Sequence, residues 1–227
     1  AEVTSNAVIY INQKKYSFEG SNLVPDLFFL CPFFVKSNPT KLKASSGFDA
    51  ISQSIESILS LKSNKTSLFF AERSLEISVS NYLNFLKYKN SNSVSKMVMS
   101  AHLSGKAISI SKTIAPHAVS YPFTSIYGIS HGHAVSLNLE KFLKFNYKYL
   151  NKANNSLDLK RRYDILNKVF KVKNITELCD KIKYFKKMAR LEDDFKKLGI
   201  NLQKDINNIL AGVNPLRLKN NPILLNK

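Results

Sequence analysis

The sequence predicts a mainly α-helical protein with a short β segment at its N-terminus. Two patterns support this fold class. Residues 7–18 combine β-branched and aromatic residues around a polar turn, which favours strands. After Pro39, apolar residues recur at helical spacing, as in the series Leu75, Val79, Tyr82 and Leu86. With 227 residues and 44% hydrophobic content, the chain is large enough for one sizeable core, or for one domain plus an appendage.

These patterns define the elements in order. Residues 7–18 predict two strands around the polar turn, and residues 26–30 predict a third short strand. Pro39 and Thr40 mark the start of a helix that runs to about Leu61. Apolar spacing predicts further helices at about residues 66–88, 93–109, 131–147, 158–172, 175–191 and 202–210.

The net charge of +18 suggests a nucleic-acid-binding protein. The charge is uneven, because residues 116–227 carry 21 Lys and Arg against 9 Asp and Glu. Segments such as 141–144 and 181–187 alternate lysine with apolar residues, as a solvated helix face over a core does. No motif of a nucleic-acid-binding fold accompanies them. We therefore expect no specific nucleic-acid partner and attribute the charge to a compositional bias toward Lys and Asn.

Several features bear on location and processing. Cys31 and Cys179 are isolated thiols without CxxC spacing, which indicates a reducing compartment. No apolar run reaches the roughly 18 residues of a membrane span, so we expect a cytoplasmic protein. Residues 1–4 resemble no targeting signal and lack a starting Met, which suggests a chain cut from a longer one. With only 7 glycines and neither GxGxxG nor GxxxxGK[ST], the chain has no recognisable phosphate-binding loop.

Four polar residues are candidates for chemistry. Asp49 and Gln53 lie four residues apart on one predicted helix, so they project from the same face. His117 and His131 lie fourteen residues apart across a segment with a proline and a glycine, so the chain turns and can bring both imidazoles to one point. One carboxylate and two neutral imidazoles form a reasonable open site for a divalent ion. The alternative is that Asp49 caps a helix, Gln53 is a surface residue, and the histidines are packed or hydrogen-bonded.

Four segments carry a resemblance to a known family, and their sequences are AEVT (1–4), GFDAISQSIE (47–56), HAVSYP (117–122) and GISHGHA (128–134). In order and spacing they resemble the iron-containing (group III) alcohol dehydrogenases. The pairs Asn214-Pro215 and Asn221-Pro222 extend the resemblance over nearly the whole chain. It implies the multi-helical C-terminal domain of that family, which is like dehydroquinate synthase.

The resemblance also implies a domain organisation. Residues 39–227 would form the helical metal- and substrate-binding domain. Residues 1–38 would be the trailing β segment of an N-terminal nucleotide-binding domain that this chain does not include. NAD(P)H would bind mainly on that missing domain, with Thr4 at the edge of the cofactor site. We therefore expect the isolated chain to be inactive.

Residues 101–121 and 127–135 resemble more narrowly the phosphonoacetaldehyde reductase branch. That branch implies reduction of phosphonoacetaldehyde to 2-hydroxyethylphosphonate by NAD(P)H. Lys106 and Lys112, with His133 as a further donor, would suit a dianionic phosphonate. The alternative is that both lysines are solvated helix positions.

Carried over residue by residue, the family's metal ligands fall on Asp49, Gln53, His117 and His131. Gln53 is a departure, because a histidine is usual there and an amide oxygen is a harder, weaker donor than imidazole. The resemblance thus leaves open a site with three protein ligands, a weaker site or a different metal, Fe²⁺ or Zn²⁺. Tyr121 stands where many members have a further histidine. We expect Tyr121 or His133 to hydrogen-bond substrate or relay a proton, and the alternative for Tyr121 is an aromatic core residue.

The implied mechanism is polarisation of an aldehyde oxygen by the metal while the nicotinamide delivers hydride. The expected partner is a small aldehyde or alcohol, and the family commonly forms dimers or larger assemblies, so we expect a homodimer. Three alternatives stay open. They are a lyase of the dehydroquinate-synthase type, a metal-free helical remnant that serves assembly, and a basic nucleic-acid-binding module.

Overall fold

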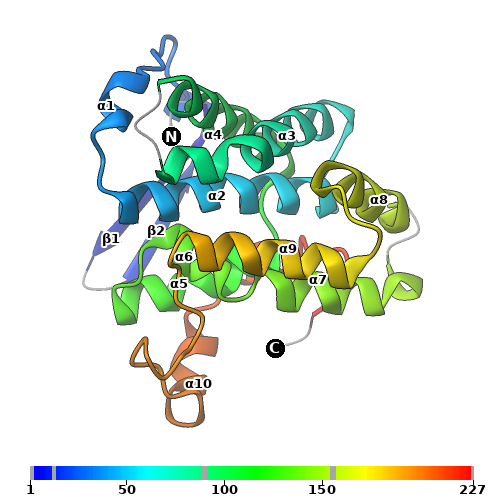
Figure 1. Cartoon of the computed structure of the whole chain (residues 1–227). Helices are drawn as coiled ribbons and strands as arrows, with labels where there is room; N and C mark the ends of the chain where they lie inside the picture. The colour runs from blue at the N-terminus through cyan, green and yellow to red at the C-terminus, as the bar shows by residue number, and fades with distance from the viewer. Residues whose placement is uncertain (1–2, 12–13, 88–90, 154–156, 226–227) are drawn as a thin grey trace.

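The computed structural model describes residues 3–11, 14–87, 91–153 and 157–225. Its central element is helix α2, which lies between two layers of helices (Figure 1). The bounds of α2 and of the first layer are Thr40–Leu59 for α2, Lys65–Lys87 for α3 and Ser91–Ser111 for α4. The second layer contains α5 (Ala115–Tyr127), α6 (His131–Ser136) and α7 (Leu139–Lys148). The predicted mainly α-helical fold is confirmed.

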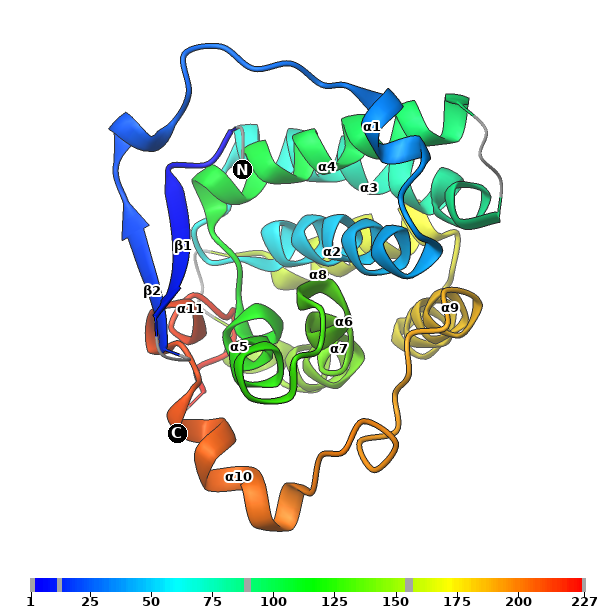
Figure 2. The same cartoon turned by 90° about the vertical axis from the view of Figure 1, so that its left-hand side faces the viewer.

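The remaining elements surround these layers. A β hairpin lies at one side of the molecule and α9 at the other, while α10 projects from the bottom (Figure 2). Helix α8 packs against α2, α3 and α9. The bounds of these helices are Pro32–Lys36 for α1, Leu159–Phe170 for α8, Ile175–Met188 for α9, Leu202–Ala211 for α10 and Pro215–Leu218 for α11. The short helices α1 and α11 were not predicted.

Helix α2 is buried on both sides, because its apolar residues fill the core and its small residues let neighbouring helices pack closely. Phe48, Ile51 and Ile55 are fully buried in the main core. Between them, buried serines let α3 and α4 approach closely: the Ser54 hydroxyl donates to Ser74 Oγ at 2.8 Å, and Ser74 donates to the Ser100 carbonyl at 2.7 Å. These hydroxyls are satisfied by hydrogen bonds, so their burial costs little.

The N-terminal strands β1 (Asn6–Ile11) and β2 (Lys14–Glu19) pair antiparallel, with Asn6 opposite Glu19. The predicted hairpin is confirmed, although residues 12–13 of its turn lie outside the described residues. The predicted third strand at residues 26–30 is wrong. Among the described residues the sheet has two strands, so this extended segment has no partner, and its Leu27 and Phe29 are 82% and 92% exposed.

Six of the predicted helices are confirmed within a few residues, although Tyr88, the expected end of α3, lies outside the described part of the chain. The single helix predicted at 131–147 is wrong, because it is divided into α6 and α7. The Asn138 amide donates to the carbonyl of Val135, three residues back, at 3.2 Å. This tighter turn interrupts the regular i to i−4 ladder and redirects the chain.

Helix α5 is the main element that sequence reasoning missed. We expected Pro122 to bend the chain, yet it lies inside α5. Proline removes a hydrogen bond to the carbonyl four residues earlier, which here belongs to Ala118. That carbonyl instead accepts from the backbone N–H of Asn214 at 3.2 Å. The turn occurs later, at Gly128, whose φ of 65° lies in the left-handed region.

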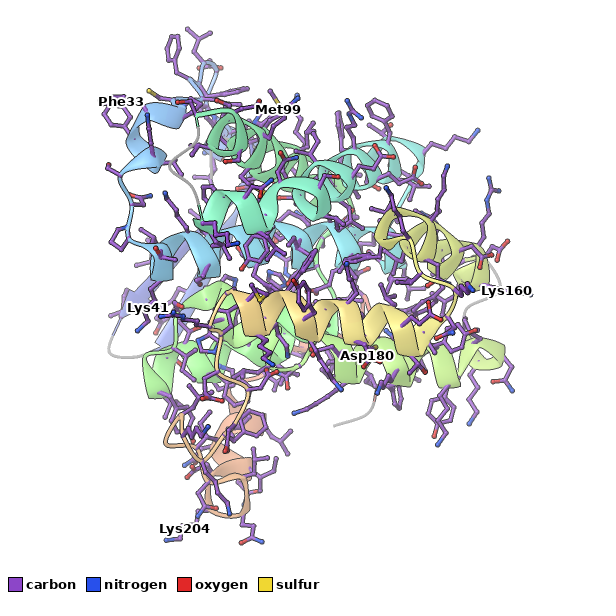
Figure 3. All side chains as sticks on the ribbon, in the orientation of Figure 1. Phe33, Lys41, Met99, Lys160, Asp180 and Lys204 are labelled. Carbon is purple, nitrogen blue, oxygen red and sulfur yellow. The ribbon has the colours of Figure 1, made fainter. Side chains whose placement is uncertain are left out.

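Lysines cover the outside of the molecule. In Figure 3, Lys41, Lys160 and Lys204 lie at its edges, and all three are exposed. Lys186 is an exception to the solvated face expected for 181–187, because it is buried and paired with Glu140 and Asp193, each at 2.6 Å. Both cysteines are free thiols. Within the described ranges, no helix is long and apolar enough to cross a bilayer.

Candidate metal centre

Three helices bring three candidate ligands to one point. Asp49 lies on α2, His117 in the first turn of α5, and His131 at the first position of α6. Asp49 Oδ1 lies 3.3 Å from His117 Nε2 and 3.9 Å from His131 Nε2. One ligand atom of each residue lies within 4.8 Å of the others, which is a spacing that a single metal ion can bridge. The expected convergence of the two imidazoles on Asp49 is present.

Gly132 lets α6 approach α2 this closely. A Cβ atom at this position would collide with the backbone oxygen of Ser45 and lie 2.8 Å from the Cβ of Asp49. A glycine directly after His131 is therefore required to seat that histidine against the carboxylate.

The Gln53 side chain, which was predicted as a metal ligand, forms hydrogen bonds with two neighbouring side chains in this structure. Its side-chain N–H donates to Asp49 Oδ2 at 2.8 Å, and its amide oxygen accepts from the Ser104 hydroxyl at 2.9 Å. Both ends of the amide are thus engaged. Gln53 fixes the second oxygen of Asp49 and leaves Oδ1 directed at the histidines.

Glu56 is a further residue at the candidate site that sequence reasoning missed. It is fully buried, and its Oε1 lies 2.5 Å from His117 Nδ1, while its Oε2 accepts from the Ile114 amide at 2.9 Å. A carboxylate only accepts, so Nδ1 carries the proton and Nε2 faces Asp49. The sequence signal was the spacing: Glu56 follows Asp49 by seven residues, two helical turns on the same face.

The electrostatics of the site suit a cation. Burial acts to lower the pKa of His117, but Glu56 and Asp49 outweigh it and raise that pKa to about 9. Burial acts to raise the pKa of Asp49, but His131, His117 and Gln53 hold it below its ordinary value. Asp49 Oδ1 and His117 Nε2 are buried and face each other at 3.3 Å, and neither atom has a well-formed hydrogen bond to any other group. The two atoms depend on each other alone, so a metal cation that took the place of the proton between them would satisfy both.

A cavity of about 160 Å³ opens beside the two histidines. Tyr121 lines it and stacks on His131, with ring centroids 6.2 Å apart. Three further predicted site residues also line it, Thr4, Gln53 and Lys112, and so does Arg217, which sequence reasoning missed. The rest of the segment 1–4 includes Ala1 and Glu2, which lie outside the described residues.

Two predicted site residues lie elsewhere. The Lys106 ammonium sits over the Phe70 ring, 5.4 Å from its centroid, and Lys106 does not line the cavity. His133 Nε2 lies 2.7 Å from the carbonyl oxygen of Glu192, and its side chain lines a separate, larger groove of about 1060 Å³. Neither side chain is placed to contact a substrate beside the histidine pair.

Comparison with known proteins identifies the family. The C-terminal model of the Fe-containing alcohol dehydrogenase family matches residues 43–226. The chain belongs to this family.

The relatives of this member of the iron-containing alcohol dehydrogenase family are named for different substrates. It is 26% identical over 151 residues to the phosphonoacetaldehyde reductase of Streptomyces viridochromogenes, covering 65% of this chain and 38% of the relative. It is 30% identical over 150 residues to the 1-propanol dehydrogenase of Citrobacter freundii, covering 64% and 40%.

Among solved structures, the sulfoacetaldehyde reductase of Bifidobacterium kashiwanohense, crystallised with NAD⁺, matches with a TM-score of 0.87 at 25% identity. The match covers 99% of this chain and 58% of that one. The chain of this alcohol dehydrogenase family member thus spans about 40–60% of the length of the relatives that it matches.

Proposed function

We propose that this chain supplies the metal- and substrate-binding half of an NAD(P)H-linked reductase of short aldehydes. The observation that carries the proposal is the convergence of Asp49 Oδ1, the buried His117 Nε2 and a ring nitrogen of His131 within 4.8 Å of one another. Family membership supports oxidoreductase chemistry for the whole protein. The match covers only 58% of the sulfoacetaldehyde reductase chain, which was crystallised with NAD⁺. This supports a second part of the whole protein that binds the nucleotide.

Asp49, His117 and His131 would hold the divalent ion, Fe²⁺ or Zn²⁺, with Gln53 holding Asp49 in place. When bound, such an ion acts as a Lewis acid toward an aldehyde oxygen. Glu56 keeps a proton on His117 Nδ1, so Nε2 is the nitrogen that would coordinate once its own proton is released. Tyr121 lines the cavity and stacks on His131, which suits it to donate a proton to the product oxygen. Thr4 marks the side of the cavity where the nicotinamide would enter.

The substrate we propose is a short aldehyde with an oxyanion at its other end, of which phosphonoacetaldehyde is the leading candidate. By their names, the Streptomyces relative reduces a phosphonate aldehyde and the Bifidobacterium relative a sulfonate aldehyde. The cavity of about 160 Å³ beside the histidines has room for a short aldehyde.

The metal site is tested by elemental analysis. The chain would be loaded anaerobically with Fe²⁺ or Zn²⁺ and separated from free metal. We expect about one equivalent to remain bound, and Asp49→Asn and His117→Ala to lose it. Asp180→Asn is the matched control, because Asp180 is an exposed carboxylate on α9. Absence of bound metal in the unmodified chain, or full retention by His117→Ala, would instead favour the metal-free helical remnant.

The division of labour is tested by turnover. We expect no NAD(P)H oxidation by the 227-residue chain alone with phosphonoacetaldehyde. We expect activity when the chain is joined to the nucleotide-binding part of a relative such as the Streptomyces enzyme. Aldehyde-dependent NAD(P)H oxidation by the chain alone would contradict the proposed division.

A further inference from the structure

Three charged residues from separate parts of the chain meet beside the candidate metal centre. Glu19 ends strand β2, Lys112 follows α4, and Arg217 lies on α11. Glu19 Oε2 lies 3.7 Å from the Lys112 ammonium, and Glu19 Oε1 accepts from Arg217 at 3.2 Å. One carboxylate therefore faces two cations, and the cluster keeps a net positive charge.

The two cations belong to the cavity wall, whereas the carboxylate does not. Lys112 and Arg217 line the same cavity as His117 and His131. No acidic residue of the described chain is among the residues that line it, and hydroxyls such as those of Ser109 and Thr113 complete the wall. A positive wall with hydroxyl donors is the chemistry that binds a phosphonate, sulfonate or carboxylate group.

Burial distinguishes the members of the cluster. The side chains of Lys112 and Arg217 are 21% and 16% exposed, whereas that of Glu19 is 51% exposed. The cations are thus held by the fold, and Glu19 reaches them from solvent. Because the Glu19 carboxylate is half exposed and can return to water, a ligand anion in the cavity can take its place at the two cations.

We propose that Lys112 and Arg217 bind the anionic end of the substrate, and that Glu19 is an internal counter-ion which this anion displaces. The inference rests on the proposed reductase function, because it names the residues that would bind the anionic end of the substrate proposed for the same site. A substrate with two negative charges competes well with one carboxylate, whereas a neutral alcohol cannot displace it. Glu19 thereby selects against neutral aldehydes, and the guanidinium of Arg217 offers two parallel donors to an oxyanion.

The experiment measures anion affinity in the full 227-residue chain after chelator treatment, by calorimetric titration with methylphosphonate. Removal of a charge-assisted bond in Arg217→Gln or Lys112→Gln is expected to weaken binding about tenfold or more. Removal of the competing charge in Glu19→Gln is expected to strengthen it about two- to fivefold. The opposite signs are the signature of displacement.

Arg73 and Glu76 form an exposed pair on α3 and provide matched controls, so Arg73→Gln and Glu76→Gln should leave the affinity unchanged. Circular dichroism checks that each variant is folded, and the two cation variants serve as independent tests. Weaker binding in Glu19→Gln, or unchanged binding in both cation variants, would overturn the proposal. Metal retention is measured in a separate experiment. A chain that binds no metal but shows these changes in anion affinity would contradict the proposed metal site and still support the anion site.

Discussion

Replacement of Glu56 by glutamine tests how the site controls His117. Glu56 is fully buried and contacts His117 Nδ1 at 2.5 Å, and it also accepts from the Ile114 amide. Glutamine keeps the shape but removes the charge, and its amide N–H can donate to Nδ1 and move the proton to Nε2, the ligand atom. Loss of such a carboxylate behind a metal-bound histidine typically weakens metal affinity 10–100-fold, about 1.4–2.7 kcal/mol.

The pH dependence sharpens this prediction. With a pKa raised to about 9, His117 must release a proton when the metal binds at neutral pH. The metal affinity of the unmodified chain should therefore rise about tenfold per pH unit and level off near pH 9. Glu56→Gln removes a charge that raises this pKa, so its affinity should level off at lower pH. The gap between the two curves should consequently be widest above pH 9, where neither protein has a proton to displace.

The assay is competition for Zn²⁺ with a chromophoric chelator from pH 6 to 9.5. Glu76→Gln, an exposed residue of α3, serves as the control. Equal affinities within twofold at pH 9.5, or curves that level off at the same pH, would refute the role assigned to Glu56. Unfolding of each variant in urea separates a general loss of stability from a loss confined to the metal.

Three further predictions address the neighbouring residues. Gly132→Ala should lower the free energy of unfolding in urea by about 1–3 kcal/mol and weaken Zn²⁺ binding, because the added methyl group collides with the Ser45 carbonyl. An unchanged Zn²⁺ affinity would show that α6 can shift freely. Gln53→His should raise Zn²⁺ affinity in the same competition assay by adding an imidazole donor beside Asp49, and a fall would show that the amide bridge to Ser104 matters more. Pro122→Ala should change stability by less than about 1 kcal/mol, because Asn214 already bonds the carbonyl that proline leaves free; a gain near 3 kcal/mol would contradict this.

Most of the helices could be predicted from sequence because their buried apolar residues recur at helical spacing. The errors fall where a distant residue decides local structure. Pro122 remains inside α5 because Asn214, 92 positions later, supplies a hydrogen bond that no local pattern reveals. The segment 26–30 has strand-like composition but no neighbouring strand among the described residues. Propensity indicates what a segment can form, and a partner decides whether it forms.

The candidate site was predicted unevenly for the same reason. Asp49, His117 and His131 were predicted as candidate ligands from their spacing and from the resemblance of their segments to a known family. Lys106 and Lys112 are both lysines near the end of α4, and only the fold shows that Lys112 faces the cavity while Lys106 lies over Phe70. Arg217 gave no signal, because an arginine near the C-terminus acquires meaning only when α11 packs beside α5.

The position of Glu56 explains why one helix organises so much of the site. Asp49, Gln53 and Glu56 occupy successive turns along one face of α2, so a single rigid helix supplies a candidate ligand, the amide that orients it and the carboxylate that orients His117. The remaining ligands come from α5 and α6, which are joined by the turn at Gly128. Gln53 therefore leaves the three-residue candidate centre in place, because its hydrogen bonds preserve the orientation of Asp49 even without coordination by residue 53 itself.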